Sequence, residues 1–333
     1  QAGARHVYAI ERGGGAALAE MVVRENGCED RVTCIRGDSA RVTLPERGTV
    51  LVSDLRGALP LHGDSLATII DARQRLLVPG ATMIPARDVV LAAPCDAPRD
   101  WSGVELALGA KPHGIARGAL ARVARATLHR DRVAPDGLLA APAHVAEIEY
   151  ATVESPDVDS GVNWRVGRDG RAEGLLLWFE TALAAGVGYG TGPAGRRTTY
   201  GTGFLPFAHP LDVRLGDRIE CRLRAKLVDG EYVFAWDSTH VPVAGAPVTM
   251  RQSSLDALAL SSGDLANLQP GHVPSPDPLD AVRALVALTD GRRTLGQIAG
   301  EIHQGQTGRF SSPSQALGWV TRTLAALNRL PDA

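Results

Sequence analysis

The sequence has few cysteines and no long apolar run. Its four cysteines, Cys28, Cys34, Cys95 and Cys221, are scattered, and none forms a C-x-x-C pair, so neither a zinc site nor a redox motif is indicated. We interpret them as buried thiols in a reducing cytosol. No apolar run approaches the roughly 20 residues that span a bilayer, and no charged-then-apolar signal segment opens the chain. We therefore expect a cytoplasmic protein that binds neither a membrane nor a metal.

The sequence also lacks an excess of charge of either sign. Its 35 Lys and Arg residues against 37 Asp and Glu give a net charge of -2, which argues against a nucleic-acid binder held by bulk electrostatics. The apolar content of 44% and the charged content of 22% are those of an ordinary soluble protein. The 333 residues suffice for two or three domains.

The first 88 residues alternate strand and helix patterns. We expect strands over residues 5–11, 31–35 and 48–53, helices over 16–26 and 65–76, and a turn over 78–80. The first helix ends at Asn26 and Gly27, which is a typical C-terminal signal. This order of elements predicts an α/β fold with a parallel sheet covered by helices.

From about residue 89 the pattern changes to short apolar runs between Gly, Pro and Asp turns. The runs lie over residues 146–150, 174–179, 204–207, 218–227 and 232–236. Several short strands at this spacing predict a sandwich or a barrel. Residues 115–128 form the one helical stretch within it. A linker is expected over residues 246–276, because Pro, Ser, Gly and Asp are frequent over residues 262–278, and helices are expected from residue 277 onward.

A strand that ends in an acid, Glu11, is the strongest local signal. In a doubly wound sheet, the acid at the end of the second strand accepts hydrogen bonds from both ribose hydroxyls of a nucleotide. Many strands end in glutamate, so this signal is weak alone and its neighbours decide its meaning.

The neighbouring segments form an ordered series. They are residues 2–11, 25–37, 51–57 and 76–80 followed by Pro85, then 177–180, 192–193, 198–200 and 210–217. In order and spacing they resemble the protein arginine methyltransferase family over roughly residues 2–236. The resemblance implies a Rossmann-like domain at 1–88 that binds S-adenosylmethionine. It also implies a β-barrel acceptor domain at 89–245 and a homodimer formed through an arm near 99–130.

The resemblance implies roles for individual residues. Glu11, with Arg12 beside it, would hold the ribose hydroxyls of the cofactor, and Asp38 and Ser39 would contact the adenine. Asp54 corresponds to the first acid of the family's double-glutamate hairpin, which grips the substrate guanidinium.

The hairpin over residues 54–64 departs from the family pattern. The second glutamate falls on Gly63, with Asp64 one place along, and the histidine that braces the hairpin acid is replaced by Thr199. Two carboxylates clamp a planar guanidinium in a bidentate way. A single acid suits a simple amine better, because it can orient the nitrogen and accept its proton. We therefore predict Asp54, and second Asp64, as the catalytic residues.

Three further residues border the predicted acceptor site. His62 is either a base or substrate contact, or a solvated loop histidine. Tyr200 either closes the acceptor pocket or packs in the barrel, and Thr199 lies beside it. The family's glycine-rich loop falls upstream of Gln1, and we expect a trimmed sequence rather than an enzyme without that loop.

Residues 277–333 resemble the small winged-helix domains of the PqqD-like kind. An apolar helix is followed by a second helix that Thr294 caps, with Gln297 at the third position as in a capping box. A third helix is expected over 314–327, with Leu317, Val320, Leu324 and Leu327 on one stripe. The domain is either a structural cap or a docking site for a peptide leader. Docking by strand addition requires strands that the sequence does not show.

These observations predict an S-adenosylmethionine-dependent N-methyltransferase that works mainly by orientation and desolvation. The Ala, Arg and Gly bias is typical of a high-GC bacterial genome. The favoured acceptor is an amine of a ribosomally made peptide natural product, with terminal-amine dimethylation as the most specific version. Two alternatives stay open: methylation of arginine, in protein or free, and a non-catalytic scaffold in a biosynthetic complex.

Overall fold

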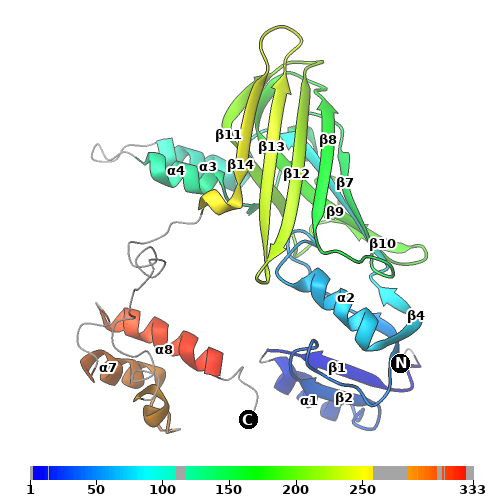
Figure 1. Ribbon diagram of the computed structural model, residues 1–333, viewed down its shortest axis with the longest axis vertical. Coiled ribbons are helices and arrows are strands. Elements are labelled where there is room, and N and C mark those ends of the chain that lie inside the picture. The colour runs from blue at the N-terminus through cyan, green and yellow to red at the C-terminus, as the bar shows by residue number, and fades with distance from the viewer. Residues whose placement is uncertain are drawn as a thin grey trace, which may run out of the picture. The chain divides into compact units, whose positions relative to one another are not determined.

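The computed structural model describes residues 3–13, 15–109, 117–257, 284–290, 292–305, 310 and 312–327. The chain divides into an N-terminal unit, Gln1–Ala259, and a C-terminal unit, Leu260–Ala333 (Figure 1). Each unit has its own buried core.

The N-terminal unit begins with alternating strands and helices, as the sequence predicts. They are β1 (Val7–Glu11), α1 (Gly15–Glu25), β2 (Val32–Arg36), β3 (Gly48–Val52), α2 (Ser65–Arg75) and β4 (Leu77–Ile84). β1 pairs in parallel with β2, and β3 pairs in parallel with β4. The parallel pairing confirms the α/β prediction.

The end of α1 follows the predicted signal. Gly27 takes a left-handed conformation with φ of 59°. Its N–H donates to the Arg24 carbonyl at 3.1 Å, and the Cys28 N–H donates to the Val23 carbonyl at 3.0 Å. These two bonds form a Schellman motif, which satisfies carbonyls that the helix leaves unpaired.

The predicted turn over residues 78–80 is wrong, because these residues lie inside β4. The register of the β3–β4 pair shifts between Gly48, opposite Leu77, and Val50, opposite Thr82. The extra residues of β4 form an irregular bulge, with Gly80 at a φ of 75°. A Pro-Gly pair is tolerated in a strand at such a point.

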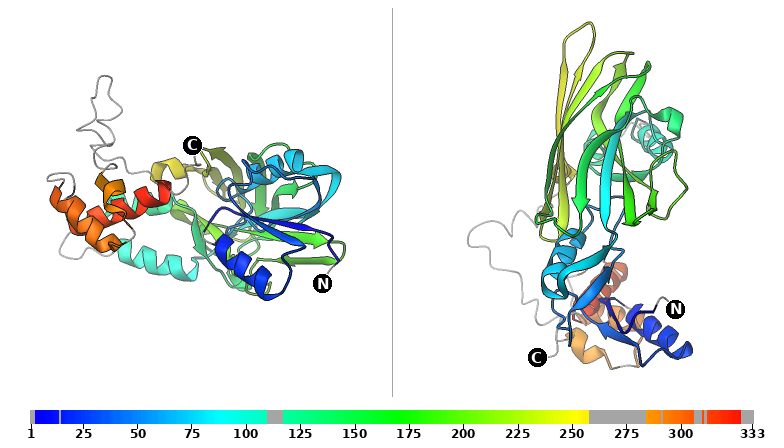
Figure 2. Two further views of the ribbon diagram at one scale, coloured as in Figure 1. Left: turned by 90° about the horizontal axis from the view of Figure 1, so that it is seen from below. Right: turned by 90° about the vertical axis from the view of Figure 1, so that its right-hand side faces the viewer.

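The rest of the N-terminal unit is mostly β-structure (Figure 2). Its strands are β5 (Arg87–Cys95), β6 (His129–Asp131), β7 (Ala143–Glu149), β8 (Val158–Arg165), β9 (Gly170–Ala184), β10 (Val187–Gly190), β11 (Thr202–Val213), β12 (Arg218–Val228), β13 (Glu231–Val241) and β14 (Val248–Ser253). The helix predicted over 115–128 is present as the shorter α4 (Gly118–Arg125), and a further helix, α3 (Arg99–Gly109), precedes it. Residues 115 and 116 of that prediction lie outside the described residues.

The predicted barrel is not closed within the part of the chain that the structure describes. Its strands form a six-stranded sheet, ordered β6-β11-β9-β5-β7 with β10 on β9, and a four-stranded sheet, ordered β14-β13-β12-β8. A register break between Pro206 and Leu211 interrupts β11. There, Gln252 of β14 accepts from the Ala208 N–H at 2.8 Å and donates to the Pro206 carbonyl at 3.1 Å. The Gln252 side chain thus links β14 to β11, whereas in a closed barrel these two edge strands would be joined by main-chain hydrogen bonds.

The central strand β9 is buried on both faces. Leu175 and Leu177 join the core between the two sheets, which also contains Trp236. Leu176 and Trp178 belong to a second cluster with Trp101 of α3. A strand covered on both faces has a continuous apolar sequence, which explains the run over 175–179.

The C-terminal unit is helical where it is described. α7 (Leu295–Gly305) and α8 (Pro313–Leu327) share a small core that includes Leu285, Ile298 and Val320. The predicted capping box is confirmed: the Thr294 N–H donates to Gln297 Oε1 at 2.8 Å, and the Gln297 N–H donates to Thr294 Oγ1 at 3.3 Å.

Other predictions for this unit are supported only in part or lie outside the described residues. No strand occurs among its described residues, so the winged-helix resemblance is not supported beyond the helices. The stripe of α8 includes Ala316 and Val320, whereas Leu317 is exposed. The linker predicted over 246–276 begins too early, because residues 248–253 form β14; the rest of it falls largely in residues 258–283, which lie outside the described residues.

Two other expectations concern the chain as a whole. Cys95 and Cys221 are buried, whereas Cys28 and Cys34 are only half-buried; all are free thiols. Within the described ranges, no helix has the length and apolar character needed to cross a membrane.

Candidate functional site

The predicted cofactor residues gather at the carboxyl ends of β1 and β2. Because these strands are parallel, Glu11 at the end of β1 lies beside Arg36 at the end of β2, and Asp38 and Ser39 follow in the next loop. The exposed Glu11 carboxylate accepts the Gly13 N–H at 2.6 Å. A side chain at Gly13 would begin only 3.0 Å from this carboxylate, so glycine here keeps the acid accessible. An accessible acid at a strand end fits a nucleotide ribose.

Arg12 connects this end to the hairpin. Its guanidinium lies 3.7 Å from Asp38 Oδ2 and 3.3 Å from Asp64 Oδ2. Ser39 is held through its main-chain carbonyl, which accepts from Arg75, and Arg75 in turn pairs with Asp71 at 2.7 Å. We predicted Arg12 as a cofactor-binding residue and Asp64 as a catalytic residue of the acceptor site. In the structure these two side chains form an ion pair.

Asp54 and Tyr200 meet at the acceptor end. Asp54 follows β3, and Tyr200 lies just before β11. The Tyr200 hydroxyl donates to Asp54 Oδ2 at 2.6 Å. Partial burial and this hydrogen bond raise the pKa of Tyr200, so the hydroxyl stays a donor at neutral pH. The structure therefore brings together residues predicted from segments 146 positions apart.

The other predicted hairpin residues do not join Asp54. Asp64 stands at the start of α2 and pairs with Arg12. Gly63 has a left-handed φ of 51°, which a glutamate would adopt only with strain. His62 is exposed, and its ring packs against the main chain of Gly57. Thr199 is exposed and contributes no bracing contact among the interactions of the described residues.

A buried cation behind Asp54 was missed by the sequence analysis. The Arg56 side chain is 5% exposed, and its guanidinium lies 3.2 Å from the carboxylate of Asp88, which is fully buried. It also donates to Thr181 Oγ1 at 3.0 Å and reaches Asp54 Oδ1 at 3.4 Å. The Tyr150 hydroxyl donates to Asp88 at 2.6 Å.

Three aromatic rings surround the same guanidinium. Its carbon lies 5.4 Å from the ring centre of Phe179, 5.8 Å from that of Tyr189 and 5.5 Å from that of Tyr200. Burial acts to lower the pKa of the Arg56 guanidinium, but Asp88 and the neighbouring tyrosines together raise it above its ordinary value. Burial raises the pKa of Asp88, while its donors favour the ionised form. The only sequence signal is a charge within the hairpin, since the partners lie on β5, β9 and β10 and in the loop before β11.

This network positions Asp54. Tyr200 holds one carboxylate oxygen, Arg56 approaches the other, and both partners are fixed by packing against Phe179. The carboxylate side chain remains 60% exposed, so a substrate nitrogen can reach it. The site can orient a nitrogen and accept a proton from it.

Several curated proteins are similar to this chain. Protein arginine N-methyltransferase 1 of Chlamydomonas reinhardtii is 26% identical over 237 residues, which cover 68% of each chain. A probable protein arginine N-methyltransferase 6 of Arabidopsis thaliana is 27% identical over 191 residues, 55% of this chain and 44% of that protein. A probable histone-arginine methyltransferase of Oryza sativa subsp. indica is 39% identical over 95 residues, 28% of this chain and 18% of that protein. The chain therefore spans less than half of the last two relatives. No family model matches it.

Solved structures show the same fold. The chain matches the Trypanosoma brucei PRMT1 enzyme-prozyme heterotetrameric complex with AdoHcy at a TM-score of 0.68, with 20% identity over 75% of this chain and 82% of that one. It matches Arabidopsis thaliana protein arginine methyltransferase 10, solved in an open conformation, at a TM-score of 0.63, with 20% identity over 76% and 83%. In sequence and in fold, this chain is therefore similar to the protein arginine methyltransferases, which are S-adenosylmethionine-dependent enzymes.

Proposed function

We propose that this chain acts as an S-adenosylmethionine-dependent N-methyltransferase whose acceptor is an arginine guanidinium. The observation that supports methyl transfer is the 2.6 Å hydrogen bond between Tyr200 and Asp54 of the hairpin. The same hairpin is joined to the cofactor end by the ion pair between Arg12 and Asp64. The choice of arginine rests on the relatives, all of which are named as arginine methyltransferases.

Each residue of the site has a distinct task in this proposal. S-adenosylmethionine supplies an electrophilic methyl group when bound. Glu11 accepts hydrogen bonds from its ribose hydroxyls. Asp54 orients the acceptor nitrogen and receives its proton, and Tyr200 fixes the direction of the Asp54 carboxylate. The buried pair of Arg56 and Asp88 holds the hairpin from behind.

A primary amine of a peptide is the second candidate acceptor, and the hairpin geometry favours it. Position 63 carries no carboxylate, and Asp64 is paired with Arg12 instead of facing Asp54. Arg56 already supplies a guanidinium to the Asp54 carboxylate. A single acid is sufficient for an amine, whose proton is lost readily on desolvation. The terminal amine of a ribosomally made peptide, methylated twice, is the most specific form of this candidate.

The test is methyl transfer by the full-length protein from labelled cofactor to two panels of peptides. One panel contains arginine with a blocked terminus, and the other has a free terminal amine and no arginine. Transfer to arginine that Asp54→Asn abolishes supports the main proposal. Transfer only to terminal amines replaces it with the second candidate. Asp212→Asn, an exposed acid on β11, is the matched control. Cofactor binding without transfer to either panel overturns both candidates.

A further inference from the structure

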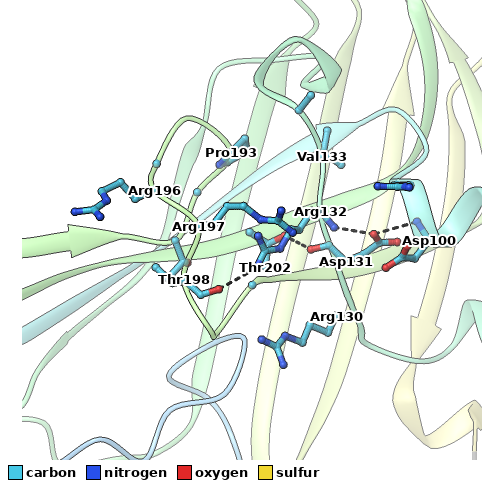
Figure 3. A pocket seen from close by; sticks show the side chains of 16 residues that line it. Asp100, Arg130, Asp131, Arg132, Val133, Pro193, Arg196, Arg197, Thr198 and Thr202 are labelled. Carbon is cyan, nitrogen blue, oxygen red and sulfur yellow. Dashed lines mark hydrogen bonds between the residues drawn. The ribbon is translucent and has the colours of Figure 1, made fainter.

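A cavity of about 690 Å³ lies beside the loop that carries Tyr200. Its walls come from the loop before β11, from β6 and the residues after it, and from the first turn of α3 (Figure 3). Five arginines line it: Arg99, Arg130, Arg132, Arg196 and Arg197. No part of the activity proposed above uses this cavity.

The two acids in the lining do not balance these charges. The buried carboxylate of Asp131 accepts the main-chain N–H groups of Trp101 at 2.7 Å and of Asp100 at 3.2 Å. It also accepts the N–H of Arg132 at 2.7 Å. Asp131 is thus committed to capping the start of α3. Asp100 is exposed on the first turn of that helix and forms no ion pair with the described residues.

None of the five arginine side chains pairs with an acid in the part of the chain that the structure describes. Arg132 donates to the main-chain carbonyl of Thr198 at 2.8 Å, which fixes its position without neutralising its charge. Within the described ranges, Arg99, Arg130, Arg196 and Arg197 form neither an ion pair nor a side-chain hydrogen bond. Many other arginines of this unit are paired, for example Arg168 with Asp96 at 2.6 Å and Arg222 with Asp159 at 2.8 Å. Cations gathered around one cavity repel each other until an anion enters.

The cavity and the acceptor end share one loop. Thr198 and Thr202 line the cavity, and Tyr200 between them contacts Asp54. Two residues of chain span about 7 Å at most, so the cavity wall begins a short distance from the Asp54 contact. Gly201, with a φ of 73°, reverses the chain there, and Arg130 packs against it. A peptide with its reacting nitrogen at Asp54 can therefore place a nearby residue in the cavity.

We propose that this cavity binds an anionic group of the substrate, namely the side-chain carboxylate of an Asp or Glu near the methylated residue. The inference rests on the proposed function for the identity of the site that it serves. Planar guanidinium groups bind carboxylates and phosphates in a bidentate way. The cavity is a local basic feature on a chain with a net charge of -2, which favours a short acidic segment over a nucleic acid. The substrate is then an acidic peptide.

Binding and turnover test the proposal separately. The protein is titrated, in the presence of S-adenosylhomocysteine, into labelled peptides that share one acceptor residue and differ in neighbouring Glu or Gln. We expect the Glu peptides to bind about tenfold more tightly, with the advantage falling as salt rises. Arg130→Gln combined with Arg197→Gln removes this advantage and leaves the Gln peptides unaffected. Arg251→Gln, an exposed arginine of β14 that pairs with no acid among the described residues, is the matched control. In turnover, the double variant raises KM for the Glu peptides and leaves kcat unchanged.

The opposite results overturn the proposal. Equal binding of Glu and Gln peptides by the unaltered protein excludes a carboxylate site, and so does an equal loss for both in the double variant. Displacement of the Glu peptide by a short oligonucleotide more readily than by a second acidic peptide would assign the cavity to nucleic acid. A phosphoserine peptide that binds more tightly than the Glu peptide, through the same arginines, identifies phosphate as the source of the anion. Because binding is measured without methyl transfer, failure of the proposed activity does not decide this test.

Discussion

Arg56 and Asp88 form a buried ion pair at the root of the acceptor hairpin. The Asp88 carboxylate is fully buried and the Arg56 side chain is 5% exposed, so neither charge can turn to water. Removing one partner of such a pair leaves an uncompensated buried charge, which costs far more than the pair contributes when it is intact.

We therefore predict that Asp88→Asn lowers the free energy of unfolding by about 3–5 kcal/mol. The measurement is urea denaturation followed by circular dichroism. Asp54→Asn, whose carboxylate is largely exposed, should change it by less than about 1 kcal/mol. An Asp88→Asn protein as stable as the unaltered one would show that the pair is not what holds the hairpin.

Glu11 is the residue on which the cofactor assignment rests. Replacing it with alanine removes the acceptor of two ribose hydroxyl groups. Loss of these charged hydrogen bonds should weaken binding of S-adenosylhomocysteine by about 2–4 kcal/mol. Calorimetry measures this, with Glu20→Ala, an exposed acid on α1, as the control. Unchanged affinity in Glu11→Ala would remove Glu11 from the cofactor site.

Asp217 should make the free energy of unfolding depend on pH in the acidic range. Burial acts to raise its pKa, but the N–H groups of Arg214 and Val243 and the His240 ring, 2.8 Å away, together lower it. A carboxylate with a lowered folded pKa adds stability above its unfolded pKa of about 3.9 and loses it as pH falls through the folded value.

Unfolding free energy should therefore fall as pH drops from about 5 toward 3, and Asp217→Asn should flatten this fall. The measurement is urea denaturation at several pH values, and the slope decides, since the variant also loses hydrogen bonds at neutral pH. Asp212→Asn should keep the slope of the unaltered protein. The same slope in Asp217→Asn would assign the acid sensitivity to other carboxylates.

At the scale of elements, the hairpin conformation explains the missing second carboxylate. Gly63 has a φ of 51°, and a Cβ there would meet only the Gly230 carbonyl oxygen at 3.8 Å. The obstacle to glutamate is therefore the backbone conformation and not a lack of space.

We predict that Gly63→Glu destabilises the protein by about 1–2 kcal/mol and does not increase transfer to arginine. Thermal unfolding measures the first effect and the peptide assay the second. Gly103→Glu, in the middle of α3 with no atom within 4 Å of a new Cβ, should have the opposite sign. A gain of arginine methylation in Gly63→Glu would show that the hairpin can adopt a two-acid clamp.

Elements whose signals are local were predictable from sequence. The end of α1 and the capping box at Thr294 depend on residues within one turn, and both are confirmed. The irregular part of β4 depends on its register against β3. The place where the barrel stays open involves the Gln252 side chain, which bonds to a strand far away in the sequence. The family resemblance placed Asp54 and Tyr200 at one acceptor site but did not predict their contact, and the partners of Arg56 come from segments that no local pattern connects.

At the scale of the whole molecule, α3 and α4 each expose a large apolar side chain. Leu106 on α3 is 79% exposed and Leu120 on α4 is 59% exposed. Large exposed apolar side chains on two neighbouring helices suggest a surface that a partner covers.

We predict a homodimer formed through these helices. Light scattering at micromolar concentration should give twice the chain mass, and Leu106→Glu with Leu120→Glu should give a monomer. Leu215→Glu, an exposed leucine outside the helices, should leave the dimer intact. A monomeric protein with full activity would contradict this prediction.

Residues close together in the loop before β11 have different roles. Tyr200 contacts Asp54, while Arg196 and Arg197 are exposed and unpaired within the described structure. Changes at these two codons alter the charge presented to a substrate without touching the reacting pair. Descendants of this protein could therefore diverge in the peptides they select through single mutations in a short stretch, while inheriting the same chemistry. The same separation marks this loop as the place to begin directed evolution of new specificities.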